Sequence, residues 1–222
     1  MLKRVANAMH NIAPLSLSAP WDNTGILLEA PYPRQNASKV FLTIDLTESV
    51  LEEALSDPAV GVIGIDIGGI NDWIANGLGQ QTSVAITPEK NPPEGQDNSG
   101  EGRLVTLANP ITLDELISKV KTHMNLKYVR VARAKDTVQS VAICAGSGIS
   151  VIGGTKSDVW LTGEMSHHEL LDAVANGTSV ILCEHSNSER GYLENSLKPK
   201  LSALVDYTVV VSKQDRDPLT VA

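Results

Sequence analysis

Aromatic residues are scarce in this chain of 222 residues, at 4% of the total, so its core has to be built from Val, Ile, Leu and Ala. Basic residues are outnumbered as well: 18 Lys and Arg face 26 Asp and Glu, which gives a formal net charge of −8. Nucleic-acid binding depends mainly on basic charge placed against phosphates. We therefore expect no nucleic-acid partner.

Cysteine is also rare, with two in the chain, which is too few for a disulfide framework. Cys144 and Cys183 each lie in an apolar run, which is typical of buried free thiols in a reducing compartment. No apolar stretch approaches the roughly 20 residues that a membrane-spanning helix needs, so no membrane association is expected. The first 17 residues favour a helix of the domain and a cytoplasmic protein, with a short mitochondrial signal as the alternative.

Hydrophobic patterning predicts an α/β fold. Short β-branched runs at 39–46, 60–67 and 207–212 read as strands, and a further short strand is expected near 25–28. From residue 103 onward, strands and helices alternate, which favours mixed, partly parallel sheets flanked by helices.

Residues 80–103 differ from the rest in composition, because they are rich in Pro, Gly, Asn and charge and have no periodicity. Such a segment predicts an exposed, mobile loop. We expect it to join two lobes of a single domain, approximately 1–80 and 103–222.

The segment CEHSNSERG offers the clearest chemistry. His185 follows an apolar strand and Glu189 lies in the first turn of the next helix, so both should lie at the carboxyl edge of the sheet, where α/β proteins bind ligands. Imidazole and carboxylate groups ligate Zn, Mn or Fe. The spacing Ser186-x-x-Glu189 is also that of a helix capping box, so Glu189 has a purely structural alternative.

Several other residues are weaker candidates. Glu164, just after the strand VWLT, is a candidate general base at the same edge, and Asp66 is a candidate ligand at the end of another strand. His167 and His168 are adjacent and would point about 100° apart on a helix, which favours solvated side chains. The hydroxyl and amide groups of 186–188 could bind an anion.

Seven segments in this order resemble the NIF-three-like family, also called the GTP cyclohydrolase I type 2 homologue family: WDNTGILL, FLTIDLT, GGINDW, ITLDELI, VAICAGSG, LTGEMSHHE and HSNSERGYL. The resemblance is strongest to the eukaryotic branch. It implies a two-lobed α/β fold, a homohexamer and two metal ions in a cleft, with His185 and Glu189 as ligands and Asp66 as a further one. It also implies either a metal-dependent hydrolase or a partner of transcriptional regulators.

One departure from that family concerns the metal site. Relatives follow the EEA helix with a strand ending in a His-Pro motif and then a His-Thr-x-x-Asp motif, whereas here no histidine lies between His10 and His123. Because a dinuclear site needs several ligands with supporting partners, we expect one weakly held ion rather than two. Two hypotheses follow: a metal-dependent hydrolase of a nucleotide-like or phosphate-bearing small molecule, or a non-catalytic interaction protein on the same fold.

Overall fold

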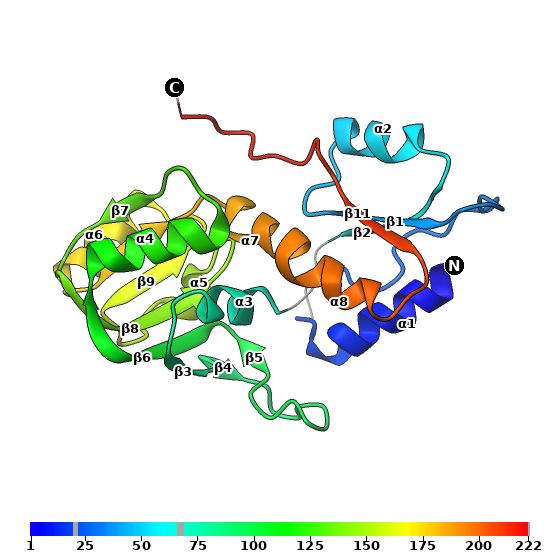
Figure 1. Cartoon of the computed structure of the whole chain (residues 1–222). Helices are drawn as coiled ribbons and strands as arrows, with labels where there is room; N and C mark the ends of the chain where they lie inside the picture. The colour runs from blue at the N-terminus through cyan, green and yellow to red at the C-terminus, as the bar shows by residue number, and fades with distance from the viewer. Residues whose placement is uncertain (20–21, 66–68, 222) are drawn as a thin grey trace. The chain divides into compact units, whose positions relative to one another are not determined.

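The computed structural model describes residues 1–19, 22–65 and 69–221 (Figure 1). The chain divides into two compact units. The first comprises Met1–Gly68 and Tyr192–Ala222, and the second comprises Gly69–Gly191. Among the described residues, every helix is too short or too polar to span a lipid bilayer.

The first unit contains a three-stranded, all-parallel sheet in the order β11-β1-β2. Phe41 and Val60 on this sheet pack against Val50 and Ala54 of α2, because the apolar positions of that helix recur at i and i+4. In Figure 1, α1 and α8 lie on the other face of the sheet. The elements of the unit are α1 (Leu2–Ile12), η1 (Leu15–Leu17), β1 (Lys39–Thr43), α2 (Glu48–Ser56), β2 (Val60–Ile65), η2 (Leu193–Leu197), α8 (Lys198–Ser202) and β11 (Thr208–Val211).

The second unit is built on a six-stranded sheet in the order β3-β6-β8-β9-β10-β7. The strands are β3 (Gln81–Val84), β6 (Arg103–Thr112), β7 (Arg130–Ala132), β8 (Thr137–Cys144), β9 (Val159–Thr162) and β10 (Ser179–Leu182), with a small hairpin of β4 (Thr87–Pro88) and β5 (Gly100–Glu101). The helices are α3 (Ile70–Asn76), α4 (Leu113–Met124), α5 (Ile149–Ile152), α6 (His167–Ala175) and α7 (Asn187–Tyr192), whose last residue begins the return to the first unit.

Burial explains the apolar runs of the central strands. All residues of β9 and β10 are buried, as expected where parallel strands are covered on both faces. Trp160, Val180 and Leu182 pack with Ala173 of α6 on one face. The alternate residues point to the other face, and α4 lies across β6 and β8 (Figure 1). The predicted α/β class, with mixed sheets flanked by helices, is confirmed.

Residues 80–103 are more ordered than the prediction of a mobile loop. The segment contains β3, β4 and β5, and it lies inside the second unit, whereas the contacts divide the chain at 68/69 and 191/192. Asn98 organises it: its Oδ1 accepts from the Ala85 N–H at 3.0 Å and its Nδ2 donates to the Ser83 carbonyl at 3.1 Å. One amide side chain thus makes the two hydrogen bonds that a neighbouring strand would make at this end of β3.

Two local predictions were wrong. The strand expected near 25–28 is irregular coil, with Leu28 88% exposed. The strand expected over 39–46 ends at Thr43, because Asp215 accepts hydrogen bonds from the Ile44 N–H at 2.7 Å and from the Thr43 hydroxyl at 3.0 Å, in place of further sheet pairing.

Asp158 ties the start of β9 to β8. Burial by itself would raise the pKa of this carboxyl, but hydrogen bonds from Lys135, from the Gln139 and Ser140 N–H groups and from the Ser140 hydroxyl outweigh it and lower the pKa from 3.8 to about 2. Since the folded-state pKa is below the unfolded one, the ionised group stabilises the fold above about pH 4. That contribution is lost as the pH falls toward 2.

We predict that Asp158→Asn lowers the free energy of unfolding at pH 7 by about 2 kcal/mol, from a shift of about two pKa units. Urea denaturation of both proteins at pH 7 and at pH 2.5 measures it. The difference between the two proteins should shrink at the lower pH, and an equal difference at both values would contradict this account.

Candidate metal-binding site at the strand ends

Three parallel strands of the second unit end together. In the central strand β9, Val159 is paired with Val141 of β8 on one side and with Ser179 of β10 on the other. The turns that follow the three strands therefore meet at one edge of the sheet. The N–H groups of Gly163 and Glu164, after β9, both donate to the carbonyl of Gly146, after β8, at 3.0 Å. These bonds hold the β8 and β9 turns against each other.

Gly163 lies where the three turns come closest. A Cβ at this position would lie 2.7 Å from the Gly146 carbonyl oxygen, 3.0 Å from the Glu184 carbonyl oxygen and 3.0 Å from the His185 Cα. These neighbours are backbone atoms, which cannot rotate away as a side chain can. Glycine is therefore required here by close backbone approach.

His185 and Glu164 form a hydrogen-bonded pair across this edge. His185 Nδ1 lies 2.6 Å from Glu164 Oε1, with both side chains about half exposed. When Nδ1 carries the proton and donates it to the carboxylate, the lone pair of the ring is on Nε2. A carboxylate in this position is the usual partner that orients a metal-binding histidine.

Glu189 and His185 converge on the space beside Gly146. A Cβ built on Gly146 would lie 2.8 Å from Glu189 Oε1 and 3.1 Å from His185 Nε2. Gly146 also has φ +64°, a conformation that glycine adopts without steric penalty. The absence of a side chain here leaves an imidazole nitrogen and a carboxylate oxygen next to one small volume.

The turn that carries His185 has an unusual backbone. Glu184 adopts φ +66°, which is uncommon for a residue with a side chain. Its carboxylate accepts two hydrogen bonds from Arg130 on the neighbouring strand β7, at 2.7 Å from Nε and 3.1 Å from Nη2. The side chain of Glu184 is therefore directed to the sheet edge, while the chain turns sharply to place His185.

The other predicted site residues fall elsewhere. His167 and His168 are exposed at the start of α6, as expected for solvated side chains. Next to them, Ser166 and Glu169 form a helix capping box, in which the Ser166 N–H donates to Glu169 Oε2 at 2.8 Å. Asp66 lies outside the described residues.

The predicted anion-binding groups at 186–188 have internal partners instead. Asn187 Oδ1 and Ser186 Oγ accept hydrogen bonds from Arg190, at 2.7 and 3.0 Å, and the Ser188 hydroxyl is buried. The geometry does not favour the predicted anion site.

The two thiols are poorly suited to nucleophilic chemistry. Burial raises the pKa of Cys183 to about 12, and burial together with the nearby Glu101 and Glu189 carboxylates raises that of Cys144 to about 11. Both are therefore neutral at pH 7, and the thiolate is the reactive form. Cys183 is buried as predicted, whereas Cys144 is partly exposed.

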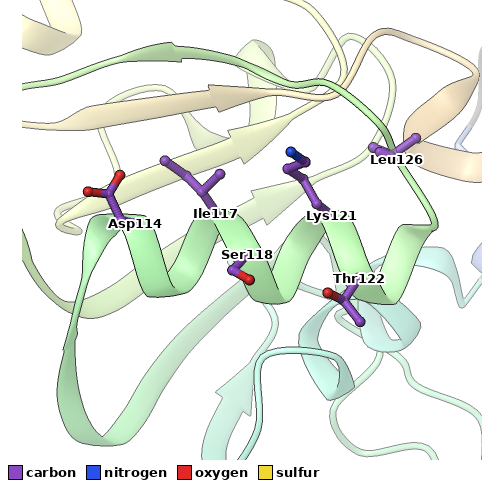
Figure 2. A pocket seen from close by; sticks show the side chains of 6 residues that line it. All are labelled: Asp114, Ile117, Ser118, Lys121, Thr122 and Leu126. Atoms are coloured by element: carbon purple, nitrogen blue, oxygen red, sulfur yellow. The ribbon is translucent and has the colours of Figure 1, made fainter.

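A shallow hollow of about 380 Å³ runs along the outer side of α4 (Figure 2). Its charged lining residues are Asp114 and Lys121, and the Asp114 carboxylate already pairs with Arg133. None of the residues of the strand-end site lines it; the lining consists of Asp114, Ile117, Ser118, Lys121, Thr122 and Leu126. The hollow along α4 is therefore separate from the candidate metal-binding site at the ends of β8, β9 and β10.

Comparison with known proteins decides the family. The chain matches the profile of Duf34/NIF3 (NGG1p interacting factor 3) over residues 1–63 and 65–218. This chain belongs to the Duf34/NIF3 family. It is 38% identical to "Protein NIF3 homolog" of Schizosaccharomyces pombe, covering 99% of this chain and 96% of that protein, and 34% identical to "NGG1-interacting factor 3" of Saccharomyces cerevisiae, covering 91% and 90%.

A solved structure shares the fold of this family member. A hypothetical protein of Staphylococcus aureus superposes with a TM-score of 0.78 at 17% identity, covering 100% of this chain and 99% of the other. At that identity the likeness establishes the fold alone. The resemblance predicted from the sequence motifs is confirmed.

The comparison also shows that this family member is shorter in its interior. About 220 of its residues, 99% of 222, are spread over 270 positions aligned with the S. pombe protein, so about 50 positions have no counterpart in this chain. The family match is interrupted at residue 64, within β2. This agrees with the absence, after the EEA helix, of the His-Pro and His-Thr-x-x-Asp motifs of the relatives.

We predict that Gly163→Ala lowers the free energy of unfolding by roughly 1–3 kcal/mol, because the added methyl group meets three backbone segments that cannot all move. Urea denaturation of the native chain and the variant measures it. A variant as stable as the native chain would show that the three turns do not pack this closely.

Proposed function

We propose that this chain binds one divalent metal ion at the carboxyl edge of β8, β9 and β10, through His185 Nε2 and Glu189 Oε1. The convergence of these two atoms beside Gly146 is the observation that carries the proposal. The hydrogen bond between His185 Nδ1 and Glu164 supports it, because it orients the ring. Zn, Mn and Fe are the metals that suit one imidazole and one carboxylate.

We propose a single ion because the chain lacks the His-Pro and His-Thr-x-x-Asp motifs of its relatives. Within 1–19, 22–65 and 69–221, no group of three or more His, Cys, Asp or Glu side chains is placed to hold a metal ion, so the proposal rests on the pair His185 and Glu189. Two ligands from the described part of the chain leave other coordination positions to water, to substrate or to the predicted ligand Asp66. Such a site is expected to hold its ion weakly.

We extend the proposal to a metal-dependent hydrolase acting on a nucleotide-like or phosphate-bearing small molecule. A divalent ion bound here supplies Lewis acidity toward a phosphoryl oxygen and lowers the pKa of a coordinated water. The high thiol pKa values of Cys144 and Cys183 favour water over a cysteine as the nucleophile. With its carboxylate at His185 Nδ1, Glu164 is better suited to orienting the imidazole than to the general-base role predicted from its position.

A second function is a protein-binding role on the same fold. The S. cerevisiae relative is named for its interaction with NGG1, and about 50 positions of the alignment with the S. pombe relative have no counterpart in this chain. If this role is the principal one, binding of a regulatory protein survives His185→Ala and no substrate turns over with added metal. The homo-oligomer and the cytoplasmic location stay predictions.

We predict that metal-free native protein binds one equivalent of Zn²⁺ or Mn²⁺ per chain. His185→Ala and Glu189→Ala should each weaken this binding by more than about 100-fold, since loss of a ligand costs more than the 10–100-fold typical of a supporting partner. His168→Ala, at an exposed imidazole on α6, is the matched control and should bind as the native chain does.

Isothermal titration calorimetry with each metal gives the affinity and the stoichiometry. Equal binding by the native chain and His185→Ala would refute the assigned ligands. A stoichiometry of two would refute the single-ion site.

We also predict that Gly146→Ala abolishes metal binding while Gly154→Ala does not. Both glycines have positive φ, at +64° and +79°, so each substitution carries a similar backbone penalty of roughly 1–2 kcal/mol. Only the methyl group at 146 would enter the space between His185 and Glu189, because nothing lies within 4 Å of a Cβ at 154. Metal titration together with thermal unfolding of the two variants separates the local from the general effect, and comparable metal affinity in both would count against the site.

A further inference from the structure

Ser188 connects the two turns that border the proposed metal site. It is the second residue of α7, and it is 1% exposed. Its hydroxyl donates to the His185 carbonyl at 2.6 Å and accepts from the Gly146 N–H at 2.8 Å. One buried oxygen thus joins the turn after β8 to the turn after β10.

The backbone N–H of Ser188 also stabilises the turn after β10. This N–H lies 3.1 Å from both the Glu184 and the His185 carbonyl oxygens. Glu184 itself adopts φ +66°, a conformation that the local sequence does not favour. A turn of this kind keeps its shape only when surrounding contacts hold it, and the Ser188 hydroxyl supplies the contact that reaches across to β8.

We infer that Ser188 is a positioning residue for the metal-facing pair of His185 and Glu189, an assignment that rests on the proposed metal site. The side chain is too deeply buried to contact an ion or substrate directly. It acts by fixing the distance between Gly146, beside which the ion is proposed to bind, and the backbone from which the imidazole extends. Without the hydroxyl, the Gly146 N–H and the His185 carbonyl each lose a buried partner, and the side-chain link between the turn after β8 and the turn after β10 is lost.

Ser179 provides a matched control. It is fully buried at the opposite end of β10, and its hydroxyl accepts from the Ala134 and Lys135 N–H groups at 3.0 and 3.2 Å and bonds the Lys135 carbonyl at 3.2 Å. Ser179→Ala therefore removes a buried hydroxyl that bridges backbone groups, as Ser188→Ala does, but far along the strand from the metal-facing residues.

The test compares Zn²⁺ affinity in the native chain, Ser188→Ala, Ser188→Thr and Ser179→Ala, by calorimetry well below the unfolding temperature of each. Ser188→Ala should raise the Kd by about 10–100-fold, as loss of a supporting partner does. Ser188→Thr keeps the hydroxyl and should restore most of the affinity. Ser179→Ala should lower the unfolding temperature similarly yet leave the Kd within about twofold of the native value.

A second readout needs no metal. Nitrogen-15 NMR of the imidazole rings, with His185 assigned by its loss in His185→Gln, reports which ring nitrogen carries the proton. The native chain should show a protonated Nδ1 held by Glu164, and Ser188→Ala should show a mixture of tautomers. Native affinity and an unchanged tautomer in Ser188→Ala would overturn the inference; absence of Zn²⁺ binding by the native chain would instead overturn the proposed function, and the tautomer comparison would still decide the role of Ser188.

Discussion

The parallel pairing of β8, β9 and β10 is the constraint on which the rest of the second unit depends. Because the three strands run the same way and in register, three turns that are distant in sequence meet at one edge. Hydrogen bonds to the Gly146 carbonyl and the close approach at Gly163 then fix the turns against each other. This backbone arrangement sets the position of His185, and the hydrogen bond to Glu164 then orients its ring.

The order of strands and helices in the second half of the chain could be predicted from the sequence, and with it the position of His185 and Glu189 at the sheet edge. An apolar run such as VILC ends where polar residues begin, so His185 and Glu189 could be assigned to the sheet edge from pattern alone. The contribution of Gly163 could not be predicted. A side chain is excluded there by the turns at Gly146 and Glu184, which are 17 and 21 residues away in sequence and approach Gly163 only in the folded chain. The same holds for Ser188. Its hydroxyl suits a ligand-binding role in the sequence, but in the fold it bonds the Gly146 N–H and the His185 carbonyl.

Composition is a misleading guide at 80–103, and the reason is physical. Pro, Gly and Asn are typical of flexible segments, but the same residues form tight turns when side chains supply the missing backbone partners. Arg103 does this as well: its guanidinium donates to the Gly100 and Gly102 carbonyls and also pairs with Asp72 of α3. Periodicity cannot reveal order that comes from single polar contacts between distant residues.

The hydrogen bonds of Asn98 bear on how the large sheet meets other chains. β3 is an outermost strand, and a strand margin with unsatisfied amides invites addition of foreign β-structure. Here a carboxamide from the chain itself occupies the Ala85 N–H and the Ser83 carbonyl. A foreign strand that pairs with this end of β3 would first have to displace the Asn98 carboxamide. These two hydrogen bonds therefore disfavour fibril-like addition of strands here.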